Sequence, residues 1–289
     1  MKEQDKLRRF LFEDLGIRGV WVSLDQSWQA VKRHQYGSEP MQEQLGQALA
    51  AVAMLSSTLK SKGAIILQTQ GNGALETLVA SATEQRKIRG LVRARNDMSS
   101  ASLPDLFGEG YLALTIKSEN AEPYQGIVPL QGQSIGQALE TYFNQSEQID
   151  THIRLCAHAG NAAGLLVQAL PDKHSDKEDW QRISLLADTL TDKELFTLDC
   201  ETLLYRLFNQ DQVRLFDTEP VAFECACSTI KIEATLESLG RPELDSVIAE
   251  QGEINVDCEF CGRHYRFDQA DVARLFATHP DVSVPDTRH

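Results

Sequence analysis

Two short stretches near the C-terminus decide how this chain is organised: Phe223-Glu-Cys225-Ala-Cys227-Ser228 and Asp257-Cys258-Glu-Phe-Cys261-Gly262. They hold four of the six cysteines, in the pattern C-x-C followed about thirty residues later by C-x-x-C. Side chains alternate faces along an extended segment, so the cysteines of the C-x-C pair project to the same side. A glycine accepts the left-handed backbone angles that close a C-x-x-C turn, and Gly262 stands where it is needed. The pattern predicts a closed tetrahedral site for one zinc ion per chain, with the metal ligands Cys225, Cys227, Cys258 and Cys261.

His264 is a further candidate ligand, because it follows the second cysteine pair closely. Four thiolates already complete the shell of a structural zinc ion. We therefore interpret His264 as a partly exposed residue of a short strand, Arg263 to Phe267.

Such a site has three possible uses: a structural staple, a zinc-ribbon module that binds nucleic acid, or a thiol switch. In a switch the metal holds reactive thiolates until they are oxidised. A C-x-C pair is unusual in structural ribbons, and its two thiols are close enough to react with each other once the metal leaves. The spacing favours the switch.

The charge of the chain argues against nucleic acid as a partner. The net charge is −14, and residues 223–289 hold 6 Lys/Arg against 13 Asp/Glu. Residues 172–222 hold 6 against 12, whereas residues 1–171 are nearly balanced. Phosphate binding depends on Lys and Arg that neutralise backbone charge, so an acidic module is poorly suited to it.

The cysteines fit a cytoplasmic protein. No apolar stretch of signal-peptide length occurs at the start, and the longest apolar run is Ala48 to Leu55, so we expect neither export nor a membrane. Cysteines in a cytosolic chain are normally reduced, which favours metal or redox chemistry over a disulfide framework. We expect Cys156 and Cys200, outside the cluster, to be buried as small apolar residues.

The fold class expected for the chain is α+β, with a mainly antiparallel N-terminal core over residues 1–171. A helix should begin after Ser38 and end in the turn that holds Lys60 and Lys62, before Gly63. The connections between the following strands are too short for crossover helices, which makes the sheet mainly antiparallel. The expected strands and second helix are Ile17–Val22, Ala64–Gln70, Leu75–Ser81, Ile88–Arg95, Tyr111–Lys117, Tyr124–Leu130, a helix over about 135–146, Ile153–His158 and Gly164–Leu170.

Residues 172–222 are expected to form a helical linker, because a polar run follows Pro171 and apolar residues then recur at helical spacing. Thr191 with Glu194 forms a capping box, and Asp199 caps the next helix. We expect the apolar stripe of Trp180, Ile183, Leu186 and Leu190 to pack on the core in the resting state.

Residues 223–289 should form the small zinc-binding domain. Its expected helices are Thr229–Leu239, Pro242–Glu250 and Asp268–Thr278. Its core list is short: Phe223, Ile232, Leu236, Leu244, Ile248, Ile254, Phe260, Phe267 and Phe276. A unit below ~70 residues usually needs a staple, which the metal provides.

Two motifs invite a catalytic interpretation that we do not adopt. Gly132-Gln-Ser134-Ile-Gly136 matches G-x-S-x-G, with His152, His158 and His174 as candidate bases. No alternating β-α pattern supplies a hydrolase sheet, and Ser134 with Gln137 is better explained as a helix cap. Gly71-Asn-Gly73 is read as a hairpin turn rather than a phosphate loop.

The cysteine spacing, together with other segments, resembles the heat shock protein 33 family of bacterial redox-regulated holdase chaperones. The segments are, in family order, Gln70-Gly-Asn-Gly73, Ile88-Arg-Gly-Leu91, Gly108-Glu-Gly-Tyr111, Tyr124-Gln-Gly126 and Tyr142-Phe-Asn-Gln-Ser-Glu147.

The resemblance implies a holdase, not an enzyme, that is inactive while its cysteines are reduced and hold zinc. Oxidants such as hypochlorite, or peroxide with heat, would form two disulfides and expel zinc. Proximity favours Cys225 with Cys227 and Cys258 with Cys261. The module and linker would then unfold, and the chain would form a homodimer that holds unfolding clients for downstream ATP-dependent foldase chaperones.

A rival interpretation is a thiol–disulfide oxidoreductase, which needs an accessible C-x-x-C at a helix N-terminus on a thioredoxin-like frame. The Cys258 pair lies instead between short expected strands.

Overall fold

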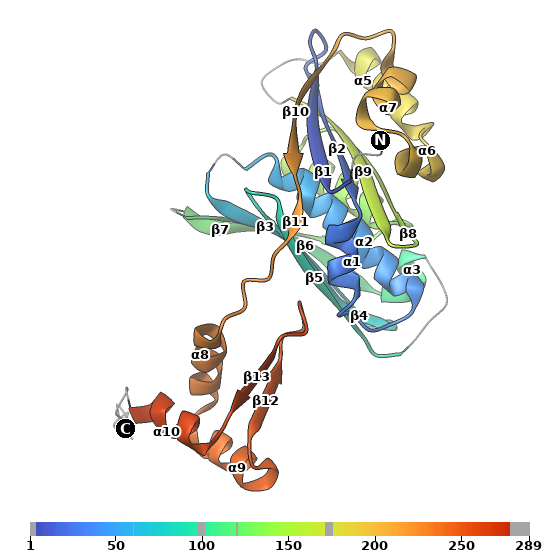
Figure 1. The fold of residues 1–289 in the computed structure, drawn as a ribbon. Coiled ribbons are helices and arrows are strands. Elements are labelled where there is room, and N and C mark those ends of the chain that lie inside the picture. Colours follow the sequence, from blue (N-terminus) through green and yellow to red (C-terminus); the bar gives the residue numbers. More distant parts are fainter. Residues whose placement is uncertain (1–3, 60, 97–101, 120, 171–175, 278–289) are drawn as a thin grey trace, which may run out of the picture. The chain divides into compact units, whose positions relative to one another are not determined.

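The computed structural model describes residues 4–59, 61–96, 102–119, 121–170 and 176–277 (Figure 1). The chain divides into two compact units, residues 1–224 and 225–289. The expected boundary at residues 171–172, His174 and the expected helix end at Thr278 lie outside the described residues.

The first unit is built on two sheets, and the expectation of a mainly antiparallel α+β fold is confirmed. All neighbouring strands run antiparallel except the short β11, which lies parallel to β5. The five-stranded sheet has the order β10 (Val213–Pro220), β1 (Lys6–Phe12), β2 (Ile17–Leu24), β9 (Asn161–Ala169), β8 (Thr151–His158). The six-stranded sheet has the order β11 (Ala222–Phe223), β5 (Lys87–Ala94), β4 (Leu75–Thr83), β3 (Gly63–Gly71), β6 (Gly110–Ser118), β7 (Ala121–Pro129).

Helices fill the space between the sheets and cover one outer face. They are α1 (Gln26–Lys32), α2 (Glu39–Ser56), α3 (Leu103–Phe107), α4 (Ile135–Tyr142), the π-helix η1 (Phe143–Glu147), α5 (Lys177–Asp188), α6 (Asp192–Thr197) and α7 (Cys200–Phe208). Neither α1 nor α3 was expected from the sequence, because both are short.

Helix α2 lies between the two sheets (Figure 1), in contact with β4 and β5 on one side and with β8 and β9 on the other. Its leucines and its alanines are therefore both buried. A side chain at Gly46 would bring its Cβ within 2.7 Å of the Ala157 Cβ, so this approach requires glycine. The helix ends at Ser56, earlier than expected. The hydroxyls of Ser56, Ser57 and Thr58 donate to the carbonyls of Ala53, Met54 and Leu55 and so close its last turn.

Helices α5–α7 pack on the outer face of the five-stranded sheet, as expected for the linker stripe. Ile183, Leu203 and Phe208 are fully buried there together with Phe10 and Phe12 of β1. The expected caps are present, with a complete capping box between Thr191 and Glu194 and the Asp199 carboxylate accepting from the Thr202 N–H. Cys156 and Cys200 are buried in the same cluster, as expected.

The segment expected to be a helical linker contains, besides helices α5–α7, strand β10, which was not expected from the sequence. β10 joins the edge of the five-stranded sheet by pairing with β1. The chain then crosses to the other sheet, where Phe223 pairs with Ile88 of β5. Phe223 thus packs against the core of the first unit, not in the zinc module as expected.

The second unit contains α8 (Thr229–Leu239), α9 (Arg241–Gln251), the hairpin β12 (Ile254–Asp257) with β13 (His264–Phe267), and α10 (Gln269–Ala277). Its core combines expected residues such as Leu236, Leu244 and Ile254 with Tyr265, Val272 and Leu275, which the sequence analysis missed. Tyr265 was missed because its register on β13 depends on the partner strand. Among the described residues, no helix is long and apolar enough to cross a membrane.

The two apparent catalytic motifs have structural roles. The Ser134 side chain accepts from the Gln137 N–H at the start of α4. His152 pairs instead with Glu140 and Asp188, and His158 pairs with Glu43. Asn72 lies in the turn between β3 and β4 and accepts from the Glu109 N–H.

Candidate metal centre

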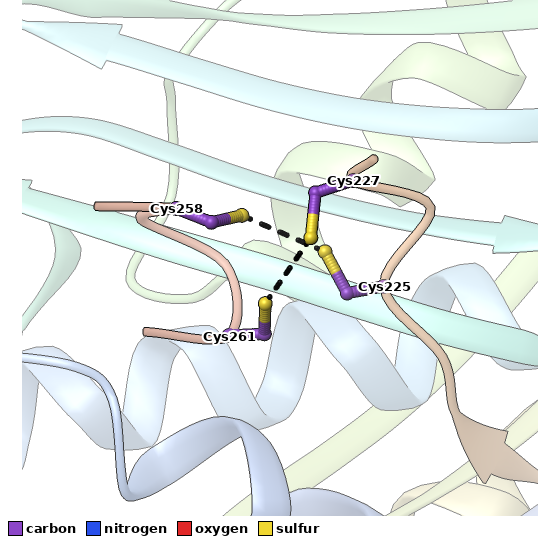
Figure 2. A group of neighbouring side chains, drawn as sticks. All are labelled: Cys225, Cys227, Cys258 and Cys261. Carbon is purple, nitrogen blue, oxygen red and sulfur yellow. Dashed lines mark hydrogen bonds between the residues drawn. The ribbon is translucent and has the colours of Figure 1, made fainter. Parts of the chain in front are cut away.

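Two separate loops of the second unit bring the four cysteines of the motif together (Figure 2). Cys225 and Cys227 lie in the extended segment that leads into α8, and Cys258 and Cys261 lie in the turn between β12 and β13. Ser228 caps α8 by accepting from the Lys231 N–H, which ends the extended segment just after Cys227.

The C-x-x-C turn is a tight knuckle held by backbone hydrogen bonds. The carbonyl of Cys258 accepts from the N–H groups of Cys261, at 3.2 Å, and Gly262, at 2.7 Å. Gly262 has a φ of 65°, the left-handed conformation for which the sequence predicted a glycine. The turn therefore aims both thiols to one side, where Figure 2 shows the sulfurs facing those of Cys225 and Cys227.

The four sulfur atoms have a spacing that suits one tetrahedral ion. Cys225 Sγ lies 3.6 Å from Cys258 Sγ, and Cys227 Sγ lies 3.5 Å from Cys261 Sγ. All four lie within 4.8 Å of one another. Thiolates about 2.3 Å from a zinc ion at tetrahedral vertices lie about 3.8 Å apart. The cysteines are free thiols rather than disulfides, so this donor set can hold a metal ion.

The electrostatics of the cluster also favour a cation. Burial raises the pKa of Cys225, and burial with donation to Cys227 raises the pKa of Cys261 to about 12. At Cys227 burial acts in the same direction, but interactions with Tyr265 and with the other thiols outweigh it and lower the pKa to about 7. A metal ion bound between the four sulfurs would stabilise their negative charge.

Tyr265 is the residue of the centre that sequence reasoning missed. Its hydroxyl is buried and makes no hydrogen bond of normal geometry with a described residue. Interaction with the Cys227 thiol nevertheless raises the Tyr265 pKa. Tyr265 thus interacts with Cys227 at the centre, and a hydroxyl in this position can support a metal-bound thiolate.

His264 is occupied outside the cluster. Its Nδ1 lies 2.7 Å from Asp257 Oδ1, and its Nε2 lies 3.1 Å from Asn255 Oδ1. Both ring nitrogens are thus used within the hairpin, in agreement with its interpretation as a strand residue.

Comparisons with known proteins agree with the resemblance. The family model described as Hsp33 protein matches residues 5–268. The 33 kDa chaperonin of Nitrosococcus oceani is 52% identical over the whole of both chains. That of Neisseria meningitidis is 44% identical, with 94% of this chain and 91% of the relative covered.

A solved structure shares the fold. The crystal structure of the 33 kDa chaperonin of Thermotoga maritima matches with a TM-score of 0.83 and 23% identity, covering 95% of this chain and 98% of that chain. The family model, the full-length relatives and the shared fold together show that this chain belongs to the Hsp33 family of chaperones.

Proposed function

We propose that this protein is a cytoplasmic holdase chaperone that is inactive while Cys225, Cys227, Cys258 and Cys261 hold zinc, and active once they are oxidised. The observation that carries the proposal is the convergence of four free thiols within 4.8 Å in a unit of only 65 residues. A module this small depends on its metal for stability, so loss of the metal is loss of the fold.

The proposed switch is the oxidation of two thiolate pairs. In each pair an S–S bond forms, and two electrons pass to an oxidant such as hypochlorite. Two disulfides leave no thiolate to hold the ion, which departs as Zn²⁺.

The proposed output is apolar surface in the first unit. The chain enters the zinc module directly after the strap formed by β10 and β11, so melting of the module frees one end of this strap. Helices α5–α7 bury their apolar faces on the five-stranded sheet, and short helices are marginal without tertiary contacts. Release of these helices would expose an apolar face that binds unfolding clients and a second copy of the chain. Clients would later pass to ATP-dependent foldases.

The experiment is a light-scattering assay of an unfolding client with the reduced, zinc-loaded protein and the oxidised protein side by side. Suppression by the oxidised form alone, in proportion to the chaperone added, is expected. Elemental analysis should find one zinc per reduced chain and none after oxidation. Cys225→Ser should lose zinc, whereas the matched control Cys156→Ser should keep it. Equal activity of the two forms would contradict the switch, and repeated turnover of a disulfide substrate would favour an oxidoreductase.

A further inference from the structure

A small cavity opens on the five-stranded sheet near the C-terminal end of α2, far in sequence from the cysteines. Its volume is about 200 Å³, and its lining includes Arg9, Leu11, Arg18, Val20, Thr58 and Phe216. Apolar side chains form most of the wall. Two arginines, Arg9 from β1 and Arg18 from β2, supply its charge.

Arg18 is a half-buried cation in the lining of this cavity. Its Nε and Nη2 both donate to one oxygen, Gln168 Oε1, and no carboxylate of a described residue pairs with it. Burial lowers the pKa of Arg18, with no acidic group acting in the opposite direction. Burying an unpaired charge is costly, and a guanidinium has five N–H donors of which two are used. The position is therefore suited to an external anion.

The surroundings of Arg18 add positive rather than negative charge. Arg9 Nε donates to Glu219 at 2.8 Å, but the same carboxylate also accepts from Arg86 at 2.6 Å. One carboxylate thus serves two guanidiniums. The three arginines Arg9, Arg18 and Arg86 together with Glu219 therefore carry net positive charge, in a protein whose formal charge is −14. An anion would be attracted here.

The wall chemistry selects a carboxylate with an apolar tail over a phosphate. The hydroxyls of Ser57 and Thr58 already donate to the carbonyls of Met54 and Leu55, so they offer no donor to additional anionic oxygens. A guanidinium matches the two oxygens of one carboxylate in a planar, bidentate contact. The volume is smaller than the roughly 300 Å³ of the smallest drug-sized sites, so the tail must be short.

We propose that this cavity binds a medium-chain fatty acid. The carboxylate accepts from Arg18, and the alkyl chain lies against Leu11, Val20 and Phe216. The site belongs to the first unit and includes none of the four cysteines.

The test is calorimetric titration of the reduced, zinc-loaded full chain with octanoate, octanol and octylammonium at matched ionic strength. Saturable binding of one octanoate per chain is expected, with octanol weaker and octylammonium not bound. Arg18→Gln should weaken octanoate binding roughly 10-fold to 100-fold, because a charge-assisted hydrogen bond is lost. Arg33→Gln, at an exposed arginine after α1, is the matched control and should bind as the unaltered protein does.

A second variant tests the cavity itself. Thr58→Trp fills the space without removing a charge and should also abolish binding, so the proposal stays testable if Arg18→Gln does not fold. Circular dichroism and zinc content report the fold of each variant. Absence of saturable octanoate binding by the unaltered protein, equal affinity of octanol and octanoate, or unchanged affinity in either folded cavity variant would overturn the proposal.

Discussion

The Sγ atoms of Cys227 and Cys261 lie 3.5 Å apart although 34 residues separate them in the chain. Cys225 and Cys258 make the corresponding contact at 3.6 Å. In the reduced fold each cysteine sulfur therefore lies about as close to a sulfur of the other loop as two thiolates on one zinc ion would lie. Proximity in this state does not select a disulfide pairing.

Pairing should be decided while oxidation of the first thiolates displaces the metal, because the two loops then separate and only neighbours in sequence stay close. We expect oxidation to join Cys225 to Cys227 and Cys258 to Cys261. Peptide mapping by mass spectrometry after hypochlorite treatment checks this. A predominance of Cys227–Cys261 would mean that oxidation outruns opening of the loops. Cys156 and Cys200 should stay reduced, because both are buried in the first unit.

Replacing Tyr265 by Phe should weaken zinc binding roughly 10-fold to 100-fold, as loss of a group that supports a metal ligand typically does. The buried hydroxyl helps to lower the pKa of Cys227 to about 7, and the phenyl ring keeps the packing while removing that proton. Competition with a chromophoric chelator measures the affinity. Tyr205→Phe, at an exposed tyrosine of α7, is the control and should match the unaltered protein. Equal affinities of all three would show that the hydroxyl does not support the centre.

Replacing Phe208 by Ala should loosen the linker without touching the cysteines. Phe208 is fully buried, and its ring packs edge-on against that of Phe12 with centroids 5.0 Å apart. Truncating such a side chain costs about 3–5 kcal/mol. We expect the reduced, zinc-loaded variant to suppress client aggregation partly, in the light-scattering assay. Tyr205→Ala on the same helix removes an aromatic ring that is 75% exposed and should leave the reduced protein inactive. Complete inactivity of the Phe208 variant would separate linker packing from chaperone activity.

The cap of α7 should make the linker sensitive to acid. The Thr202 N–H donates to the Asp199 carboxylate and lowers its pKa below the ordinary value. A lowered folded-state pKa means that this stabilisation is present above the unfolded-state pKa and is lost as the pH falls through the folded-state value. Asp199→Ala should therefore weaken protection of α7 amides by about 1 kcal/mol at neutral pH, with the difference vanishing in strong acid. Asp199→Asn keeps an acceptor, so it should show most of the protection and little pH dependence in hydrogen exchange.

The contact between Arg86 and Glu219 should hold the strap to the six-stranded sheet. The Glu219 carboxylate of β10 accepts from the buried Arg86 guanidinium at 2.6 Å. Two residues later, the Val221 N–H donates to the backbone carbonyl of Asp5. Glu219→Gln leaves a buried guanidinium without its anion, at a cost of about 1–3 kcal/mol. Faster hydrogen exchange over residues 213–223 is the expected result. Glu201→Gln removes an exposed partner of Arg8 and should leave that exchange unchanged; similar effects of the two variants would count against a specific latch.

The sequence by itself determined the features that depend on neighbours along the chain. The cysteine spacing predicted which thiols meet, and a glycine after Cys261 predicted the left-handed turn that the structure shows at Gly262. Thr191 with Glu194 and Asp199 likewise predicted two helix starts. Each depends on hydrogen bonds or backbone angles within a few residues, so local chemistry suffices.

Tertiary structure alone decided the features that depend on distant partners. Phe223 has the composition of a core residue in either unit, and its pairing with Ile88 became apparent only once β5 was in place. The Arg8 Nε on β1 donates to the carbonyl of Phe216 on β10, 208 residues away in the chain, because β10 pairs with β1 in the five-stranded sheet. Tyr265 and Arg18 are ordinary residues in sequence. The fold brings Tyr265 to the Cys227 thiol, and it places Arg18 where no carboxylate of a described residue pairs with it. Such partners are selected by packing over the whole unit, and no local pattern encodes that packing.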